Sequence, residues 1–551
     1  MSEPEIRLDS IQKRQQSSYT VAEVILEQLR IWGVKRIYGV IGDAIFSLMD
    51  AIAKQKTIKF IAVKHESVAA MMASAEAKCT GGLGVCVSQM GPGLANLING
   101  LGDAYLDAFP VLAITGQAPI NKIGTSYKQF INQQELVQAI TSYSELIVHL
   151  DAVIDSLTKA IHTSFEMETV SHISIPLDIF SMSTLVQPNG ATHKSTISIC
   201  PKQLEQGIHV MRTAENPMIL VGTSSASLML DIQELAKLWG SGIAMGYGVI
   251  GILPDSFPYG LGVIGEGGNP FLTDLFKQAD VVLAIGASWW PEGQTPTNAT
   301  VIQVQDKQIK LGNGMPSDYS VIGDMKEIVK QLISKLEPYE RNQNWIHQII
   351  QCKQTWSIRN EKEGEKPGYP IYPSRTIRAI ERSINPDTII ALDEGDSTLW
   401  FMRNFRAGCE RVLLSNQWRT MGFGLPAAIA AKLCMPTKQV VCITGDGGLA
   451  MVLADLLTVV RYQLQITLIV FNNGTLQMER NKMELKGLTP EGTELTNPDF
   501  VKLAKACGWD AYRIQSEDEL DKLLKTALQS NNPVLLDVPT AQDEYPNYPK
   551  S

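Results

Sequence analysis

Apolar runs long enough for buried strands alternate with helical patterns along nearly the whole chain of 551 residues. In the first third these runs are Arg36–Val40, Lys59–Val63, Leu83–Ser88 and Val111–Thr115, with a helical pattern, Ser67–Lys78, between two of them. Strands that alternate with helices form parallel sheets covered by helices on both faces. The alternation therefore predicts an α/β protein built from doubly wound sheets.

The chain is too long for one hydrophobic core. Two polar stretches that contain glycine and proline, Thr184–Cys200 and Glu361–Pro373, are typical of linkers. Further strand-like runs lie at Met218–Gly222, Val281–Gly286, Val301–Gln305, Thr388–Leu392 and Pro533–Val538. We expect three consecutive doubly wound α/β domains, at residues 17–183, 200–336 and 370–540, of which the first and third have similar size and layout.

Composition excludes several classes of partner. The formal net charge is −9 and no run is rich in Lys and Arg, which argues against nucleic acid. No stretch of 18 apolar residues occurs, Met1–Thr20 lacks the apolar centre of a secretory signal, and Tyr545–Ser551 is too proline-broken for a membrane-bound amphipathic helix. The eight cysteines form no CxxC pair, which predicts reduced thiols. We expect a cytoplasmic protein without nucleic-acid or membrane partners.

One strand–helix–strand segment of the last third carries candidate metal ligands. An apolar run ends at Asp446 among glycines; the helical pattern Leu449–Tyr462, the strand-like run Ile466–Phe471 and Asn473 follow. Parallel strands joined by a helix bring their carboxyl ends to the same edge of a sheet, so Asp446 and Asn473 are expected to converge. With a nearby backbone carbonyl, such as that of Thr475, they would form an oxygen cage suited to Mg²⁺.

Gly447 and Gly448 follow this acid at the predicted start of a helix, where backbone N–H groups bind a diphosphate well. Taken singly, an Asp-Gly turn and an Asn-Gly turn are common in α/β proteins and need no function. Together, in this strand–helix–strand frame, they resemble the metal and diphosphate signature of thiamine-diphosphate enzymes.

The resemblance extends over roughly residues 17 to 540. Tyr38–Asp43, Lys64–Ala70, Gly91–Asn96 and Pro110–Gln117 resemble the pyrimidine-binding domain of the pyruvate oxidase and acetohydroxyacid synthase family, and Thr420–Lys432 resembles that family's run before the metal motif. Within the family the chain is most similar to pyruvate oxidase of the quinone type, without its membrane-binding tail. The resemblance implies thiamine diphosphate and Mg²⁺ as cofactors, a small 2-keto acid as substrate, and a homodimer or homotetramer with the active site at the subunit interface.

Glu66 matches the family's catalytic glutamate, which pairs with a ring nitrogen of the aminopyrimidine and so promotes removal of the thiazolium proton. Because Glu66 follows an apolar run, we expect a buried carboxylate; the alternative is a cap of the following helix. The resemblance also implies that Pro92 and Asn96 contact the cofactor.

The resemblance assigns further cofactor contacts in the last third. Met421 matches a bulky apolar wedge that keeps the cofactor bent, a role compatible with the alternative of core packing. Gly395 and Asp396 are expected near the diphosphate, the alternative being ordinary turn chemistry. Gly445, Gly447, Gly448 and Asn473 complete the implied cofactor site.

Several residues face the expected reacting centre. Gln129 matches a glutamine of oxidases and synthases, with a surface glutamine as the alternative; no adjacent histidine pair of the simple decarboxylases occurs. Lys128, Met478 and Lys482 stand where the family has Phe, Phe, and Glu or Gln. One hypothesis is that the lysines hold an anionic group of the substrate; the alternative is that they point to solvent.

The sequence does not decide whether the central domain binds FAD. Val221–Ala226 holds one glycine where flavin-binding members have several, and Val304–Lys307 lacks the expected spacing of acids. Gly286–Glu292 nevertheless resembles the loop that runs beside the flavin. With FAD the chain would be an oxidase, and without it a lyase or carboligase.

The leading functional prediction is a pyruvate oxidase-like enzyme. It would decarboxylate a small 2-keto acid, with pyruvate as the first candidate, and then oxidise or transfer the acyl group. The first alternative is an acetolactate synthase-type carboligase without redox chemistry. The second alternative is a non-catalytic member of the family, against which Glu66, Asp446 and Asn473 together argue.

Overall fold

The computed structural model describes residues 19–190, 198–287, 289–290, 298–308, 311, 315–337, 339–406, 408–409 and 411–543. The C-terminal segment Tyr545–Ser551, most of Met1–Thr20 and part of the first expected linker lie outside these residues. The chain divides into two compact units, Met1–His193 and Lys194–Ser551.

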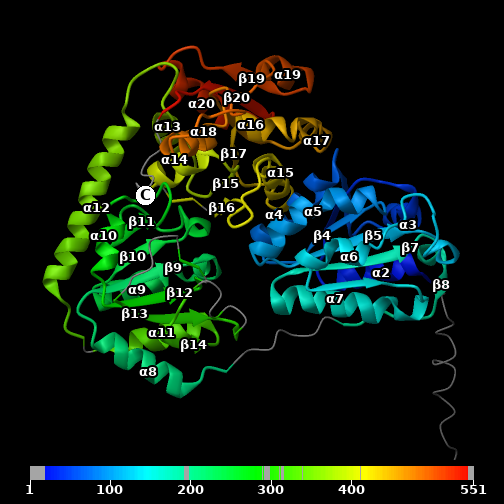
Figure 1. Ribbon diagram of the computed structural model, residues 1–551, viewed down its shortest axis with the longest axis horizontal. Helices are drawn as coiled ribbons and strands as arrows, with labels where there is room; N and C mark the ends of the chain where they lie inside the picture. The colour runs from blue at the N-terminus through cyan, green and yellow to red at the C-terminus, as the bar shows by residue number, and fades with distance from the viewer. Residues whose placement is uncertain are drawn as a thin grey trace, which may run out of the picture. The chain divides into compact units, whose positions relative to one another are not determined.

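The first unit contains one six-stranded sheet in the order β3-β2-β4-β5-β7-β6, with every pair parallel (Figure 1). Its strands are β2 (Arg36–Gly39), β3 (Lys59–Ala62), β4 (Gly84–Ser88), β5 (Val111–Gln117), β6 (Tyr143–Leu146) and β7 (Val170–Pro176). Its helices are α2 (Val21–Ile31), α3 (Phe46–Lys54), α4 (Glu66–Thr80), α5 (Pro92–Leu106), α6 (Gln133–Val137) and α7 (Val153–Met167). Strands β4 and β5 are buried along their whole length, as expected for a sheet with both faces covered.

The central domain begins the second unit, and its six parallel strands have the order β11-β10-β9-β12-β13-β14. They are β9 (Pro217–Val221), β10 (Gly242–Met245), β11 (Gly260–Val263), β12 (Val281–Ile285), β13 (Thr300–Gln305) and β14 (Tyr319–Ile322). The helices are α8 (Pro201–Arg212), α9 (Met229–Trp239), α10 (Leu272–Lys277) and α11 (Met325–Leu336). The chain order reverses between β9 and β12.

A long helix, α12 (Gln343–Gly364), joins the central and C-terminal domains within the second unit. The expected linker Glu361–Pro373 therefore starts too early, because its first residues complete the last turn of α12. The sequence here is polar overall, but Trp345, Ile349 and Trp356 are buried along one side of the helix. Asn342 caps its first turn.

The C-terminal domain has the strand order β16-β15-β17-β18-β20-β19, again all parallel. Its strands are β15 (Ile389–Leu392), β16 (Arg411–Leu413), β17 (Val440–Gly445), β18 (Thr467–Asn472), β19 (Asp510–Arg513) and β20 (Val534–Pro539). Its helices are α13 (Pro373–Ser383), α14 (Asp396–Asn404), α15 (Gly424–Cys434), α16 (Asp446–Ala450), α17 (Leu456–Arg461), α18 (Gln477–Leu485), α19 (Phe500–Ala506) and α20 (Glu519–Leu528). The expected three α/β domains with parallel sheets are confirmed.

One expected element is wrong in detail. The helical pattern Leu449–Tyr462 forms no single helix but α16, a 3-10 turn η9 (Leu453–Asp455) and α17. The backbone leaves the helical region at Val452 (φ −130°, ψ 19°). At this break Gly422, in the loop before α15, packs against the Val452 side chain, so the chain turns where that loop lies on it.

Within the part of the chain that the structure describes, no helix is both long enough and apolar enough to cross a membrane.

Candidate active site

The carboxyl ends of the neighbouring strands β17 and β18 bring Asp446 and Asn473 together, as expected. Asp446 is buried, and its Oδ2 accepts hydrogen bonds from the backbone N–H of Gly474 and from Nδ2 of Asn497, both at 2.7 Å. Its Oδ1 accepts one from the Gly447 N–H at 2.9 Å. Burial raises the pKa of Asp446, which these hydrogen bonds oppose. The carboxylate therefore has a fixed orientation at the strand edge.

The turn after β18 is also held in place. The side-chain oxygen of Asn473 accepts a hydrogen bond from the Thr475 N–H at 3.2 Å, and its backbone carbonyl accepts one from Gln542 Nε2 at 2.9 Å. The Thr475 hydroxyl donates to the Thr493 carbonyl at 3.0 Å. The Thr475 hydroxyl is thus used within the protein, which leaves a backbone carbonyl as the contribution expected of this residue.

An open pocket with about 510 Å³ of empty space lies at this edge of the sheet. The residues expected from the sequence that line it are Gly395, Asp396, Met421, Gly445, Asp446, Gly447, Gly448, Asn473, Thr475 and Met478. Segments from the ends of three strands, the loop before α15 and the start of α18 thus converge on one cavity.

Three polar atoms of pocket-lining residues are buried without any hydrogen-bond partner among the described residues. They are Asp396 Oδ1, Ser397 Oγ and Gln477 Oε1. Burial also raises the pKa of Asp396 to about 7. Because buried polar groups in proteins are nearly always paired, these atoms fit a pocket whose ligand supplies the missing partners.

Close packing favours glycine at two of the lining positions, more strongly at Gly448 than at Gly447. A Cβ on Gly448 would lie 2.5 Å from Asp393 Oδ2, and one on Gly447 would lie 3.0 Å from a methyl carbon of Leu476 and 3.2 Å from the Met421 Cε. Met421 therefore packs directly on the glycine turn while it lines the pocket.

Asp393 organises this site and was missed from the sequence. It is fully buried at the end of β15, where its Oδ1 accepts hydrogen bonds from the N–H groups of Gly422 (2.8 Å) and Phe423 (3.1 Å), and its Oδ2 accepts one from the Thr444 hydroxyl (2.7 Å). Burial raises its pKa to about 6. The sequence signal was an acid directly after an apolar run, two residues before Gly395.

Helix α18 carries Met478 and Lys482, the two residues that differ from those usual in the family, and it places their side chains differently. Met478 lines the pocket, whereas Lys482, one turn later, does not. The Lys482 Nζ lies 3.3 Å from Oε1 of Glu479, and its side chain is largely covered.

In the first unit, Glu66 and Asn96 lie on the neighbouring helices α4 and α5. Asn96 Nδ2 donates a hydrogen bond to Glu66 Oε2 at 2.9 Å, and Pro92 is the first residue of α5. The expectation that Glu66 is buried at a strand end is wrong for this chain by itself. Strand β3 ends at Ala62, and Glu66 is a half-buried residue in the first turn of α4.

A polar network surrounds Gln129. Gln89 Nε2 donates to Gln129 Oε1 at 2.9 Å and to Asp43 Oδ1 at 2.6 Å. Lys128 Nζ pairs with Asp43 Oδ2 at 2.8 Å, and this lysine holds the pKa of Asp43 below its usual range. Gln129 has a left-handed backbone (φ +61°), and its carbonyl lies so close to Gly91 that a Cβ there would be 2.5 Å away. The positive charge of Lys128 is therefore already paired.

The structure of the central domain does not test the binding of FAD, which stays a prediction. The turn after β9 carries Gly222, whose Cβ position lies 2.2 Å from the Gly286 carbonyl, so the ends of β9 and β12 pack on each other. Of the loop that resembles a flavin-binding loop, Ser288 and residues 291–292 lie outside the described residues.

Comparison with known proteins gives a consistent answer. Three domains of the "Thiamine pyrophosphate enzyme" family match: the N-terminal TPP binding domain at residues 19–136, the central domain at 204–332 and the C-terminal TPP binding domain at 393–538. The chain is 30% identical over 524 residues to "Putative thiamine pyrophosphate-containing protein YdaP" of Bacillus subtilis (94% of this chain, 91% of the relative). It is 28% identical over 542 residues to the pyruvate oxidase of Lactiplantibacillus plantarum (96% and 89%) and 29% identical over 532 residues to the acetolactate synthase isozyme 2 large subunit of Escherichia coli (94% and 95%). The chain therefore belongs to the thiamine pyrophosphate (thiamine diphosphate) enzyme family.

Proposed function

We propose that the chain is a magnesium-dependent thiamine-diphosphate enzyme that decarboxylates a small 2-keto acid and then oxidises or transfers the acyl group, in the manner of pyruvate oxidase. Pyruvate is the first candidate substrate. The observation that carries the proposal is the fixed pair Asp446 and Asn473 at the edge of a pocket with three unpartnered buried polar atoms. Relatives named pyruvate oxidase and acetolactate synthase support the substrate class.

The C-terminal domain would hold the cofactor's charged end. The carboxylate of Asp446, the amide oxygen of Asn473 and the Thr475 carbonyl are hard oxygen ligands of the kind that Mg²⁺ takes. Gly395, Asp396 and the Gly445–Gly448 turn would surround the diphosphate, and Met421 would support the rings. Once bound, thiamine diphosphate supplies the carbon nucleophile and the electron sink for decarboxylation, while the protein positions it.

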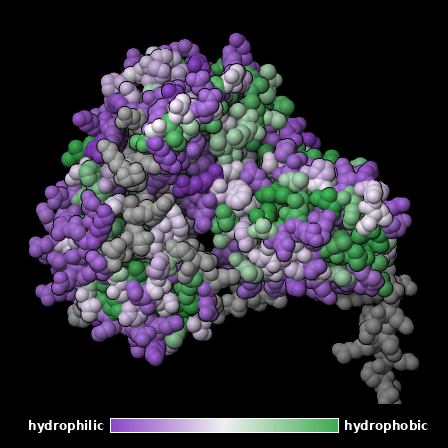
Figure 2. Space-filling model, in the orientation of Figure 1, coloured by the Kyte–Doolittle hydropathy of each residue, from purple (hydrophilic) through white to green (hydrophobic). Residues whose placement is uncertain are grey.

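The first unit would supply the activating acid. Glu66 Oε2 is held by Asn96, so its other oxygen is oriented to share a proton with the aminopyrimidine ring nitrogen. Gln129 and Met478 would face the reacting carbon. We place the complete site in a homodimer or homotetramer, because apolar side chains such as Met451 and Leu457 are exposed beside α16 and α17, where Figure 2 shows an apolar patch.

The test is calorimetric titration of the purified protein with thiamine diphosphate, in Mg²⁺ and in excess EDTA. We expect binding that requires the metal and is lost in Asp446→Asn. The matched control is Asp499→Asn, at an exposed helix cap of the same domain, which should bind as the wild type does. Absence of binding by the wild type under both conditions would refute the proposal.

An acetolactate synthase-type carboligase is the second candidate function. The single glycine of the turn after β9, packed against the end of β12, supports it because a flavin-dependent oxidase needs room for FAD in that domain. A visible spectrum and product analysis separate the two. A yellow protein that oxidises pyruvate would favour the oxidase, and a colourless protein that forms acetolactate would favour the carboligase.

A further inference from the structure

Glu394 is a carboxyl group in the wall of the cofactor pocket to which the sequence assigns no role. It lies between Asp393 and Gly395, directly after β15, and lines the same pocket as Asp446 and Met421. Only 8% of the residue is exposed, so its side chain is nine-tenths buried at the wall of the pocket. Its side chain forms no hydrogen bond or ion pair within the described residues.

The charged groups that face Glu394 are already engaged elsewhere. Arg419, in the loop before α15, directs its Nη1 to Glu266 Oε2 of the central domain at 3.0 Å. Lys482 of α18 pairs with Glu479. Burial raises the pKa of Glu394 to about 7; the charges of Arg419 and Lys482 oppose this rise, and those of Asp393 and Glu266 add to it.

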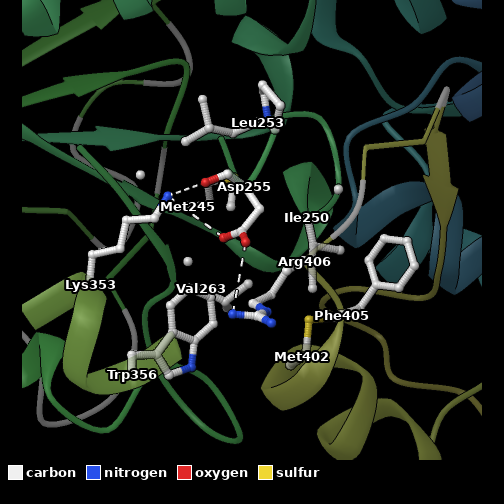
Figure 3. A pocket seen from close by; sticks show the side chains of 14 residues that line it. Met245, Ile250, Leu253, Asp255, Val263, Lys353, Trp356, Met402, Phe405 and Arg406 are labelled. Atoms are coloured by element: carbon white, nitrogen blue, oxygen red, sulfur yellow. Dashed lines mark hydrogen bonds and ion pairs between the residues drawn. The ribbon is translucent and has the colours of Figure 1, made fainter. Parts of the chain in front are cut away.

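A second pocket of the same unit provides a contrast (Figure 3). There the acid Asp255 lies between two cations, with Oδ1 3.6 Å from the Lys353 Nζ and Oδ2 3.8 Å from the Arg406 Nη1. The carboxylate in that cavity has protein partners, so it needs none from a ligand. Glu394 also lines a pocket, but its carboxyl has no hydrogen-bond or ion-pair partner among the residues that the structure describes.

A buried carboxyl without a partner costs free energy. A protein that gains nothing from such a group is more stable with an apolar side chain there. At a binding site the cost is offset when a bound molecule donates the missing hydrogen bond.

We propose that Glu394 is a ligand-binding residue: it accepts a hydrogen bond from an N–H or O–H donor of the molecule in the pocket and thereby selects for a donor at this wall. The inference rests on the proposed function. Two sources have this chemistry, the amino-substituted ring of the cofactor and a hydroxyl or amino group of the 2-keto acid substrate.

The experiment compares wild type with Glu394→Gln, which keeps the shape, and Glu394→Leu, which removes the polar group. The control is Glu484→Gln, an exposed glutamate on α18 outside the pocket that pairs with Arg480. Three quantities are measured for each: the Kd of thiamine diphosphate in Mg²⁺, the KM and kcat for pyruvate and for a 2-keto acid that carries a hydroxyl group, and the Tm of the ligand-free protein.

If the cofactor supplies the donor, Glu394→Leu weakens thiamine diphosphate binding by about 10-fold or more, the expected effect of one lost charged hydrogen bond. If the substrate supplies it, Kd is unchanged, kcat/KM falls by a similar factor for the 2-keto acid that carries a hydroxyl group, and kcat/KM for pyruvate, which has no donor, stays within twofold of wild type. In both cases the ligand-free Tm of Glu394→Leu is at least that of wild type, because an unpaired buried carboxyl has gone.

The inference is overturned if Kd, and kcat/KM for both 2-keto acids, stay within twofold of wild type while Tm is unchanged or raised. It is also overturned if Tm falls in both variants, since the carboxyl then has a structural partner. A wild-type protein that binds no thiamine diphosphate refutes the proposed function itself, a result that the wild-type titration reports separately.

Discussion

The first domain and the C-terminal domain have the same strand order. If the strands of each domain are numbered one to six along the chain, both sheets have the order 2-1-3-4-6-5. Their strand ends carry different groups. After the third strand the first domain has Gln89 and the C-terminal domain has Asp446. After the first strand the first domain has Asp43, half-exposed and paired with Lys128, whereas the C-terminal domain has Asp393, buried among backbone N–H groups.

The comparison shows that the same strand order can carry either exposed or buried acidic side chains after its strands. In the first domain an amide side chain and an exposed ion pair occupy the strand ends, and the carboxylate of Glu66 lies on α4, where Asn96 binds it. In the C-terminal domain buried acids hold the loops of the pocket and offer oxygen ligands to a cation. Under the proposed function, the first domain would act on the cofactor and the C-terminal domain would hold it.

The largest expected effect separates catalysis by the first domain from cofactor binding by the C-terminal domain. Glu66→Gln should lower turnover of pyruvate by about 1000-fold, the size of a general acid–base contribution, because the amide cannot share the proton. Thiamine diphosphate affinity should change by less than about 3-fold, because the amide N–H of the variant can still donate a hydrogen bond to the ring nitrogen. Steady-state rates and calorimetry on the same preparation measure both. Equal losses of rate and of affinity would contradict the division between the two domains.

The next effect concerns stability. Asp393→Ala leaves the N–H groups of Gly422 and Phe423 without a partner and should lower the free energy of unfolding by about 3 kcal/mol. Asp43→Ala, in the loop after the first strand of the first domain, should cost less than about 1 kcal/mol, because its ion pair is exposed. Urea unfolding of both variants is the measurement. Similar losses would show that the two strand ends do not differ as described.

The two domains should also respond to pH with opposite signs. The pKa of Glu394 is raised from 4.5 to about 7, so its contribution to stability is present below pH 4.5 and is lost as pH rises to 7, about 3 kcal/mol in all. The pKa of Asp43 is lowered from 3.8, so its contribution is present above pH 4 and is lost as pH falls. Thermal melts of wild type and Glu394→Gln between pH 5 and 8 should differ increasingly toward pH 8, with the variant more stable there. A constant difference would argue against the raised pKa.

The smallest effect concerns the two lysines. Lys128 and Lys482 are each paired with an acid, so Lys128→Met and Lys482→Met should change the KM for pyruvate by less than about 3-fold. Kinetics with pyruvate and with a 2-keto acid that carries a second carboxylate measure this. A KM that rises about 10-fold only for the dianionic substrate would restore the hypothesis that the lysines hold an anionic group.

Much of the fold was predictable because buried parallel strands are apolar along their whole length. The expected runs Val111–Thr115 and Val281–Gly286 match β5 and β12 to within two residues at either end. Helix α12 was not predictable, because its buried tryptophans lie in a segment that is polar on average. The break at Val452 depends on a loop that the sequence places 30 residues earlier, so no local pattern reports it.

The site was predictable where a motif combined chemistry with spacing, as at Asp446 and Asn473. Asp393 and Glu394 could not be recognised, because an acid after a strand is usually an exposed turn residue. The burial of Asp393 follows from the loop at Gly422 and Phe423, whose N–H groups bond to it at the end of β15. Such tertiary contacts have no signature in the neighbouring sequence.

Helix α12 also fixes the number of residues between its two anchors, Trp345 and Glu363. At its start the Trp345 indole N–H donates to the Pro217 carbonyl of the central sheet at 2.9 Å. Near its end Glu363 accepts two hydrogen bonds from the Arg403 guanidinium, at 2.8 and 2.9 Å, on α14, the helix whose first residue is Asp396. A helix advances about 1.5 Å and turns about 100° per residue, so inserting or deleting one residue between these anchors would misdirect one of them. This stretch can therefore change in composition during evolution far more readily than in residue count.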